Sequence, residues 1–205
     1  MCDAEVTSSP PPDISTDAEI IECSLGEPER FAELFDRHHR AIFGYLARRV
    51  GADEAEDITS EVFMRSFDRR DRFDLAYESA RPWLFGIARN IYLNRIRSKR
   101  TEPTVTVRDD DIVVPDHALS VAWAVDSQSE LNDPTLVAAV ESLNPKYREV
   151  LLMYAVDEMT HNEIASALGV PQGTVQSRLG RARAAIREHA PSSMLRPDDD
   201  GSKHG

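Results

Sequence analysis

Residues 160–188 read THNEIASALGVPQGTVQSRLGRARAAIRE and contain every signal needed for two consecutive helices. Thr160 and Glu163 have the spacing of a capping box at a helix start. Gly169 stands where that helix would end, and Pro171 suits the first turn of the next one because its missing N–H would have no partner there. Two helices joined by a short turn that contains glycine predict a helix-turn-helix, which places its second helix in the major groove of DNA.

The second of these helices has two different faces at 100° per residue. One face predicts an apolar stripe toward a core and consists of Val175, Leu179, Ala182 and Ile186. The opposite face and its flanks combine small residues with side chains that bond base edges and phosphates, namely Thr174, Gln176, Ser177, Arg178, Gly180, Arg181 and Ala184. A solvated basic helix in an ordinary bundle is the alternative interpretation.

Composition limits the class of protein. The chain has 205 residues, a formal net charge of −12 and 41% hydrophobic residues, and no run approaches the ~18 apolar residues of a membrane span. Its start lacks the basic and apolar regions of a secretory signal, so we expect a cytoplasmic protein without membrane insertion. Cys2 and Cys23 form no CxxC motif and are interpreted as incidental thiols, with a redox pair as the alternative.

Periodicity and charge divide the chain into segments. Residues 1–26 are rich in Pro, Ser, Thr and acids and predict a disordered lead, while 27–100 carry three amphipathic helices. Residues 101–133 hold eight acidic residues against one arginine and predict a flexible linker, with one short helical piece around 119–125. Residues 134–190 predict a four-helix unit, and 191–205 a loose tail. The predicted fold class is all-α, with a three-helix domain and a helix-turn-helix domain joined by the linker.

Two helices of the first domain carry contrasting chemistry. Residues 81–100, RPWLFGIARNIYLNRIRSKR, mix aromatic and asparagine side chains with six cations and no acid, which suits a DNA strand with splayed bases. A core helix with a solvated basic face explains that segment equally well. In residues 53–67, DEAEDITSEVFMRSF, Asp57 and Glu61 share a face that suits a basic protein partner, although a solvated acidic face is the simpler interpretation of this segment alone.

Taken together, the segments resemble the RNA polymerase sigma factors of the sigma-70 family, in their small extracytoplasmic-function group. FAELFDRHHRAIFGYLARRV (31–50) and DEAEDITSEVFMRSF (53–67) look like the start and the polymerase-binding helix of domain 2. Residues 81–100 are similar to the helix that reads and opens the −10 promoter element, and residues 136–186 to domain 4, which binds the −35 element. The order of EDITSEVF, WLFGIARN and GVPQGTVQSRLGRAR along one chain is highly specific.

The resemblance implies roles residue by residue. Core polymerase, through its β′ and β subunits, would be bound by Asp57, Ile58, Glu61, Val62 and Phe63. The loop 69–79 would hold a flipped −10 base, and the separated strand would lie along Trp83, Asn90, Asn94, Arg95 and Arg97. The −35 element would meet Thr174, Gln176, Ser177, Arg178, Arg181 and Arg183. Promoter DNA and an anti-sigma factor are the further implied partners, and no cofactor or metal is implied.

Rival functions explain less of the sequence. No phosphate-binding glycine loop, GxSxG or HExxH motif and no zinc spacing occurs, so we do not expect an enzyme. A stand-alone helix-turn-helix regulator would account for residues 134–190. It would leave EDITSEVF and WLFGIARN without a role, and it predicts a dimer for which the sequence shows no dimerisation segment.

Overall fold

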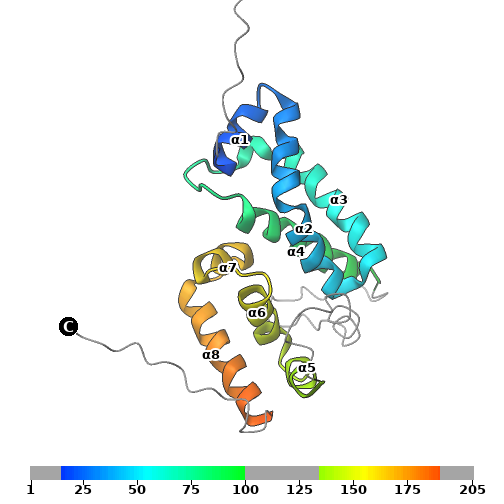
Figure 1. The fold of residues 1–205 in the computed structure, drawn as a ribbon, viewed down its shortest axis with the longest axis vertical. Coiled ribbons are helices and arrows are strands. Elements are labelled where there is room, and N and C mark those ends of the chain that lie inside the picture. Colours follow the sequence, from blue (N-terminus) through cyan, green and yellow to red (C-terminus); the bar gives the residue numbers. More distant parts are fainter. Residues whose placement is uncertain (1–14, 100–133, 190–205) are drawn as a thin grey trace, which may run out of the picture.

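The computed structural model describes residues 15–99 and 134–189, and every regular element within these ranges is a helix (Figure 1). The N-terminal unit (15–99) contains α1 (Asp17–Ser24), η1 (Pro28–Arg30), α2 (Phe31–Val50), α3 (Ala52–Asp68), η2 (Arg70–Arg72) and α4 (Arg81–Lys99). The C-terminal unit (134–189) contains α5 (Pro134–Glu141), α6 (Pro145–Ala155), α7 (His161–Leu168) and α8 (Gln172–His189). The predicted all-helical fold is confirmed. The short helical piece near 119–125, the tail 191–205 and the start of the lead lie outside the described residues.

The prediction of a disordered lead over residues 1–26 is wrong for its last part, because Asp17–Ser24 form helix α1. Thr16 caps α1 in a capping box with Glu19, and Ile20 and Ile21 are fully buried in the core of the N-terminal unit. The segment is too short for periodicity to predict it, and an isolated helix of this length is unstable in water. Its stability comes from burying its isoleucines against the longer helices.

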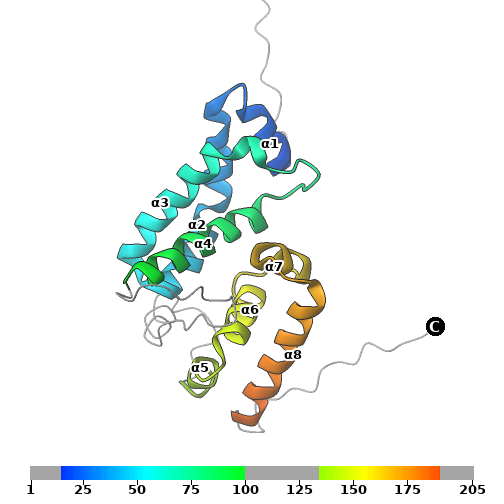
Figure 2. The ribbon, with the colours of Figure 1, turned by 180° about the vertical axis from the view of Figure 1, so that it is seen from behind.

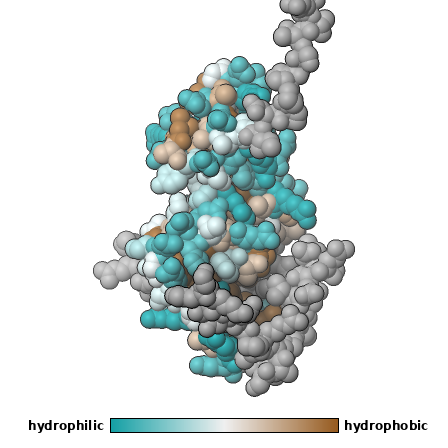
Figure 3. Space-filling model, turned by 60° about the vertical axis from the view of Figure 1, so that its left-hand side comes forward, coloured by the Kyte–Doolittle hydropathy of each residue, from teal (hydrophilic) through white to brown (hydrophobic). Residues whose placement is uncertain are grey.

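The core of the N-terminal unit forms where α2, α3 and α4 pack against one another (Figures 1 and 2). Its largest fully buried side chains include Leu34, Ile42, Tyr45, Leu46, Ile58, Leu84, Phe85 and Tyr92. The phenyl ring of Phe85 meets the ring of Tyr45 edge to face, at 5.0 Å between centroids. The face in Figure 3 is mostly hydrophilic, with small apolar patches near the top of the N-terminal unit.

The local signals of the helix-turn-helix are all realised. The Thr160 Oγ accepts from the Glu163 N–H at 3.3 Å, and the Glu163 carboxylate accepts from the Thr160 N–H at 2.8 Å. Gly169 ends α7 at φ 66°, in the left-handed region that glycine adopts without steric cost. Val175, Leu179 and Ala182 of α8 are buried, and Ile186 packs against a smaller cluster with Val140 and Leu152. The predicted core stripe of α8 is therefore confirmed.

The two units also touch one another. In both views α7 lies beside α4, and the contacts between the elements agree (Figures 1 and 2). One hydrophobic cluster runs from the N-terminal unit into the C-terminal unit, where it includes Val150, Met153, Met159, Ile164 and Leu168. The sequence, which predicts two units on a flexible linker, gives no indication of this contact.

Candidate nucleic-acid interface

Helix α8 presents a basic and polar face away from its buried stripe. Gln176, Ser177, Arg181 and Arg183 are exposed, and Thr174 and Arg178 are half-buried. These six side chains are the ones predicted to contact duplex DNA, and each of them is at least partly exposed to solvent. The helix therefore combines a packed inner face with an outer face suited to base edges and phosphates.

Two tyrosines of α6 support the arginines of α8. The Arg181 guanidinium donates to the Tyr147 hydroxyl at 2.9 Å, and this hydrogen bond lowers the pKa of Tyr147. The Arg183 guanidinium lies 5.5 Å from the centre of the Tyr154 ring. Tyr147 and Tyr154 are seven residues apart, so they share one face of α6. The spacing of the two tyrosines is visible in the sequence. Only the packing of α6 on α8 shows that both of them lie beside arginines of α8.

The predicted strand-binding residues of α4 differ in their exposure and in their partners. Asn90, Asn94 and Arg97 are exposed, and Trp83 is half-buried with its ring 5.3 Å from the Phe73 ring. Arg95 is already paired, because its guanidinium lies 2.9 Å from the Glu61 carboxylate. An arginine held in this way is positioned at the surface, and DNA phosphates would have to compete with Glu61 for it.

A cavity of about 680 Å³ lies beside the exposed face of α4. From the N-terminal unit it is lined by Trp83, Gly86, Ile87, Arg89 and Asn90, and by residues of the 69–79 loop that include Arg69, Phe73 and Tyr77. The loop therefore lies beside Trp83 and Asn90. The cavity has aromatic walls for stacking and amide or guanidinium groups for hydrogen bonds, which is the chemistry that unpaired bases need.

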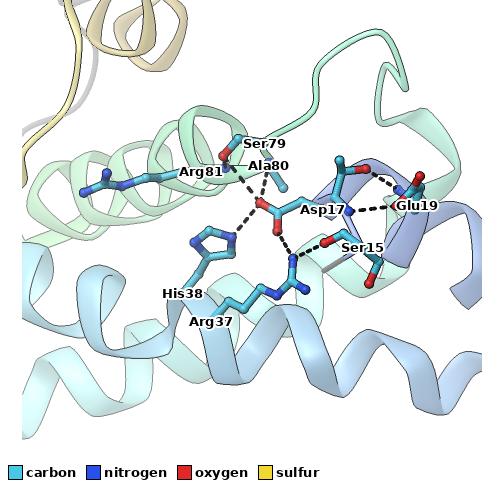
Figure 4. A network of polar contacts seen from close by, with 9 residues as sticks. Ser15, Asp17, Glu19, Arg37, His38, Ser79, Ala80 and Arg81 are labelled. Carbon is cyan, nitrogen blue, oxygen red and sulfur yellow. Dashed lines mark hydrogen bonds and ion pairs between the residues drawn. The ribbon is translucent and has the colours of Figure 1, made fainter. Parts of the chain in front are cut away.

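The end of this loop is held by the buried carboxylate of Asp17 in α1 (Figure 4). It accepts hydrogen bonds from the Ala80 N–H at 2.9 Å and from the Ser79 hydroxyl at 3.4 Å, both at the start of α4. From α2, Arg37 donates to it at 3.1 Å, and the His38 Nε2 lies 2.7 Å away. One side chain thus ties together α1, α2 and the beginning of α4.

The environment of Asp17 favours its ionised form. Burial by itself raises the pKa of this carboxyl group, but the hydrogen bond and charge of His38, the Ala80 N–H and the Arg37 guanidinium together lower it. The folded pKa therefore lies below the unfolded value of about 3.9. Such a group contributes stability above the unfolded pKa, and this contribution is lost as pH falls through the folded pKa.

Asp17→Ala is expected to lower the free energy of unfolding by roughly 2–4 kcal/mol at pH 7, because it leaves buried donors without their acceptor. The difference from wild type should shrink as pH falls below the unfolded pKa of about 3.9 and toward the lower folded pKa of Asp17, where the folded protein takes up the proton. Urea unfolding at pH 7 and pH 3, followed by circular dichroism, measures both effects. Asp71→Ala, at an exposed carboxylate of η2, is the matched control. Equal stability of the Asp17 and Asp71 variants at pH 7 would contradict the role of this network.

The acidic helix α3 exposes fewer of the predicted polymerase-binding residues than the sequence indicates. Asp57 is exposed, but Ile58 and Val62 have no exposed surface and Phe63 is 6% exposed. These three residues form core, so their predicted contact with a partner is corrected. Their spacing of three and four residues fits a buried stripe as well as an exposed one, and only the packing on α2 and α4 distinguishes the two.

One exposed residue of α3, Met64, is missing from the predicted polymerase-binding residues. Met64 is 64% exposed and shares a face with Asp57 and Ser60, at spacings of three and four residues. Glu61 is half-buried and paired with Arg65 at 2.5 Å and with Arg95 at 2.9 Å. Of the two acids predicted to bind polymerase, only Asp57 is therefore exposed, and Met64 adds an exposed apolar side chain to the same face.

The described residues contain neither a candidate metal site nor a candidate membrane-spanning helix. Within residues 15–99 and 134–189, no three His, Cys, Asp or Glu side chains lie where they could hold a metal ion together. None of the helices in this part of the chain is long and apolar enough to cross a lipid bilayer.

An all-helical unit with a basic helix, followed by a helix-turn-helix unit, is the arrangement of a DNA-binding transcription protein. Residues 34–102 match the family model for sigma-70 region 2, and residues 135–186 match that for sigma-70 region 4. The chain belongs to the extracytoplasmic-function sigma factors of the sigma-70 family, which direct promoter recognition by RNA polymerase and are not enzymes. This membership confirms the resemblance, the predicted function as a sigma factor in promoter recognition, and the expectation that the protein is not an enzyme.

Similar proteins come from several bacteria. The chain is 30% identical over 179 residues to the ECF RNA polymerase sigma factor SigW of Bacillus subtilis, covering 82% of this chain and 93% of that protein. It is 27% identical over 194 residues to SigC of Mycobacterium tuberculosis, covering 95% and 98%. Two solved structures share the fold: CnrH in complex with the cytosolic domain of CnrY (TM-score 0.58, 23% identity, 84% of this chain and 95% of that chain) and RpoE with the anti-sigma factor NepR from Bartonella quintana (0.56, 20%, 77% and 94%).

Proposed function

We propose that this sigma factor divides its contacts among three helices. The exposed Asp57 and Met64 of α3 bind core RNA polymerase, α4 with the 69–79 loop binds the separated −10 strand, and α8 binds the −35 duplex. The observation that carries the proposal is the cavity beside α4, whose N-terminal walls bring the 69–79 loop, Trp83 and Asn90 together. The proposed −10 helix and the loop walls of this cavity both belong to the N-terminal unit.

The −10 contact is assigned by exposure and charge. A single strand laid along Trp83, Asn90 and Asn94 would meet an aromatic ring and two amides, which stack on bases and bond their edges. Arg97 lies beside Asn94, to whose side-chain oxygen it donates at 3.3 Å, and it supplies charge for the backbone. Arg95 acts in our proposal as a positioned cation, because Glu61 orients it.

The −35 contact is assigned to the outer face of α8. Ser177 and Gly180 let the helix axis approach the groove floor, while Gln176 and Arg181 reach base edges and Arg178 and Arg183 reach phosphates. Thr174 lies at the helix start, where it can contact the backbone. We keep the domain boundaries 27–100 and 134–190 in this proposal and add α1 (Asp17–Ser24) to the first domain, because Ile20 and Ile21 are buried in its core.

An anti-sigma factor and a cytoplasmic location complete the proposal. One of the two similar solved structures is the sigma factor RpoE in complex with the anti-sigma factor NepR, and this supports a partner of the same kind here. A cytoplasmic location follows from the place where polymerase and promoter DNA are found.

Run-off transcription tests the proposal as a whole. Bacterial core polymerase, with and without this protein, is supplied with promoter-bearing genomic fragments, and new specific transcripts are expected only with the protein. Permanganate should then reveal unpaired thymines at the −10 position of the active promoters. Tight duplex binding by the protein alone, together with no transcript from any fragment, would contradict the proposal and favour a stand-alone regulator.

A further inference from the structure

Arg181 of α8 is oriented by a neighbouring helix. The residues three and four positions from it on α8 include no acid, and they are Ser177, Arg178, Ala184 and Ala185. The guanidinium of Arg181 instead donates to the hydroxyl of Tyr147 in α6, at 2.9 Å, and lies 5.9 Å from the centre of the same ring. Because Arg181 is otherwise exposed, the contact with Tyr147 defines the direction of a long and flexible side chain.

The partner of Arg181 is a neutral hydroxyl, which leaves the positive charge of the guanidinium uncompensated. Arg95 of α4 shows the contrast, since the Glu61 carboxylate lies 2.9 Å from its guanidinium and offsets the charge. A guanidinium carries five N–H groups, so the one donated to Tyr147 leaves four for another partner. Two of these can form the paired hydrogen bonds that arginine makes to O6 and N7 of guanine. Arg181 is thus oriented and still able to read a base.

Tyr147 is itself held firmly by the fold. It lies in the first turn of α6, which begins at Pro145 and is capped by the Asn144 side chain. About one helical turn further on, Val150 is buried in the same hydrophobic cluster as Leu179 of α8. A tyrosine has only two side-chain torsions to fix, so little conformational entropy is lost when it supports another residue. The position of the Tyr147 hydroxyl relative to α8 is therefore set by the packing of the core.

We propose that Tyr147 is a positioning residue for promoter recognition, whose hydroxyl holds the Arg181 guanidinium in place for one guanine of the −35 duplex. The inference rests on the proposed assignment of Arg181 to base edges. A side chain that is already ordered loses less conformational entropy when it binds, and for one arginine this corresponds to roughly two- to tenfold in affinity. Because the gain is realised only at the base pair that Arg181 reads, Tyr147 sharpens the preference for that base pair without contacting it.

Base discrimination by the holoenzyme tests this role. Competition binding is measured with promoter duplexes that differ from one another in single −35 base pairs. The base pair read by Arg181 is identified first, as the one at which Arg181→Ala removes the preference. Tyr147→Phe keeps the ring and removes only the hydroxyl, so we expect it to lower the preference at that base pair by roughly two- to tenfold and to leave the other −35 preferences unchanged.

Two comparisons separate positioning from a direct contact. In the Arg181→Ala background, Tyr147→Phe should have no further effect, because the side chain through which it acts is gone. Tyr154→Phe is the matched control, since it removes a hydroxyl from the same face of α6 and leaves the ring beside Arg183. It should not change the preference at the Arg181 base pair.

The ordering of Arg181 is also measurable without DNA. Relaxation of the Nε–H group of Arg181, recorded by nuclear magnetic resonance on the free full-length chain, reports how far this side chain moves. Its order parameter should fall in Tyr147→Phe and stay at the wild-type value in Tyr154→Phe. Thermal unfolding of both variants should match wild type, because Tyr147 and Tyr154 are partly exposed and their rings are retained.

The outcomes separate this inference from the proposed function. An equal loss of affinity for every −35 sequence, or a loss that persists in the Arg181→Ala background, would overturn the positioning role and indicate that Tyr147 contacts the DNA itself. An unchanged order parameter of Arg181 in Tyr147→Phe would overturn it as well. If Arg181→Ala alters no −35 preference of the holoenzyme, the proposed assignment of Arg181 to base edges fails, and the inference that rests on it fails too.

Discussion

Asp57→Arg is expected to reduce promoter-specific transcription by at least about tenfold, because it places a cation where a basic surface of polymerase would bind. Asp57 is exposed, and the hydrophobic core of the N-terminal unit does not depend on it. The variant should therefore fold normally while losing affinity for core polymerase. Run-off transcription, and co-elution with core polymerase in gel filtration, measure the two losses separately.

The choice of Asp57 over Glu61 comes from the structure. Glu61→Arg would break the pairs with Arg65 and Arg95, and so it would disturb the −10 helix together with the proposed polymerase surface. Glu22→Arg, at an exposed position of α1, changes the net charge by the same amount and serves as the control. Normal transcription by the Asp57 variant, at a level matching the Glu22 variant, would rule out this docking surface.

Ser177→Glu is expected to remove binding of the −35 element almost completely. Ser177 lies at the centre of the outer face of α8 and is exposed, so a carboxylate there would face the phosphates and acceptor atoms of the groove. We expect a loss of 10-fold or more in transcription from promoters that depend on −35 contacts, equivalent to at least about 1.4 kcal/mol. Footprinting of the holoenzyme should show lost protection around −35, while a preformed −10 bubble is still bound.

Ala138→Glu is the matched control for this prediction. It adds the same charge to an exposed position of α5, on a helix to which we assign no contact with DNA. Thermal unfolding of both variants should resemble wild type. If Ser177→Glu retains its −35 footprint, then α8 does not enter the groove through this face, and the assignment of Gln176 and Arg181 to base edges is wrong as well.

The predicted sites differ in how much of them the sequence could determine. The outer face of α8 was predictable because an amphipathic helix with one clear apolar stripe leaves only the opposite face for DNA. Helix α3 has apolar residues on more than one side, so periodicity did not separate buried Ile58 and Val62 from exposed Met64. The pairing of Glu61 with Arg95 joins residues 34 positions apart, and no local pattern encodes it.

What the sequence by itself determined about this protein is its local architecture and its family. The capping box at Thr160, the glycine at 169 and the proline at 171 act over three or four residues, so each can be recognised without knowledge of the fold. The tertiary structure alone decided that α1 is a helix, that Asp17 holds the start of α4, and that α7 packs against α4. These features depend on burial between distant segments, and burial is settled only when those segments pack together.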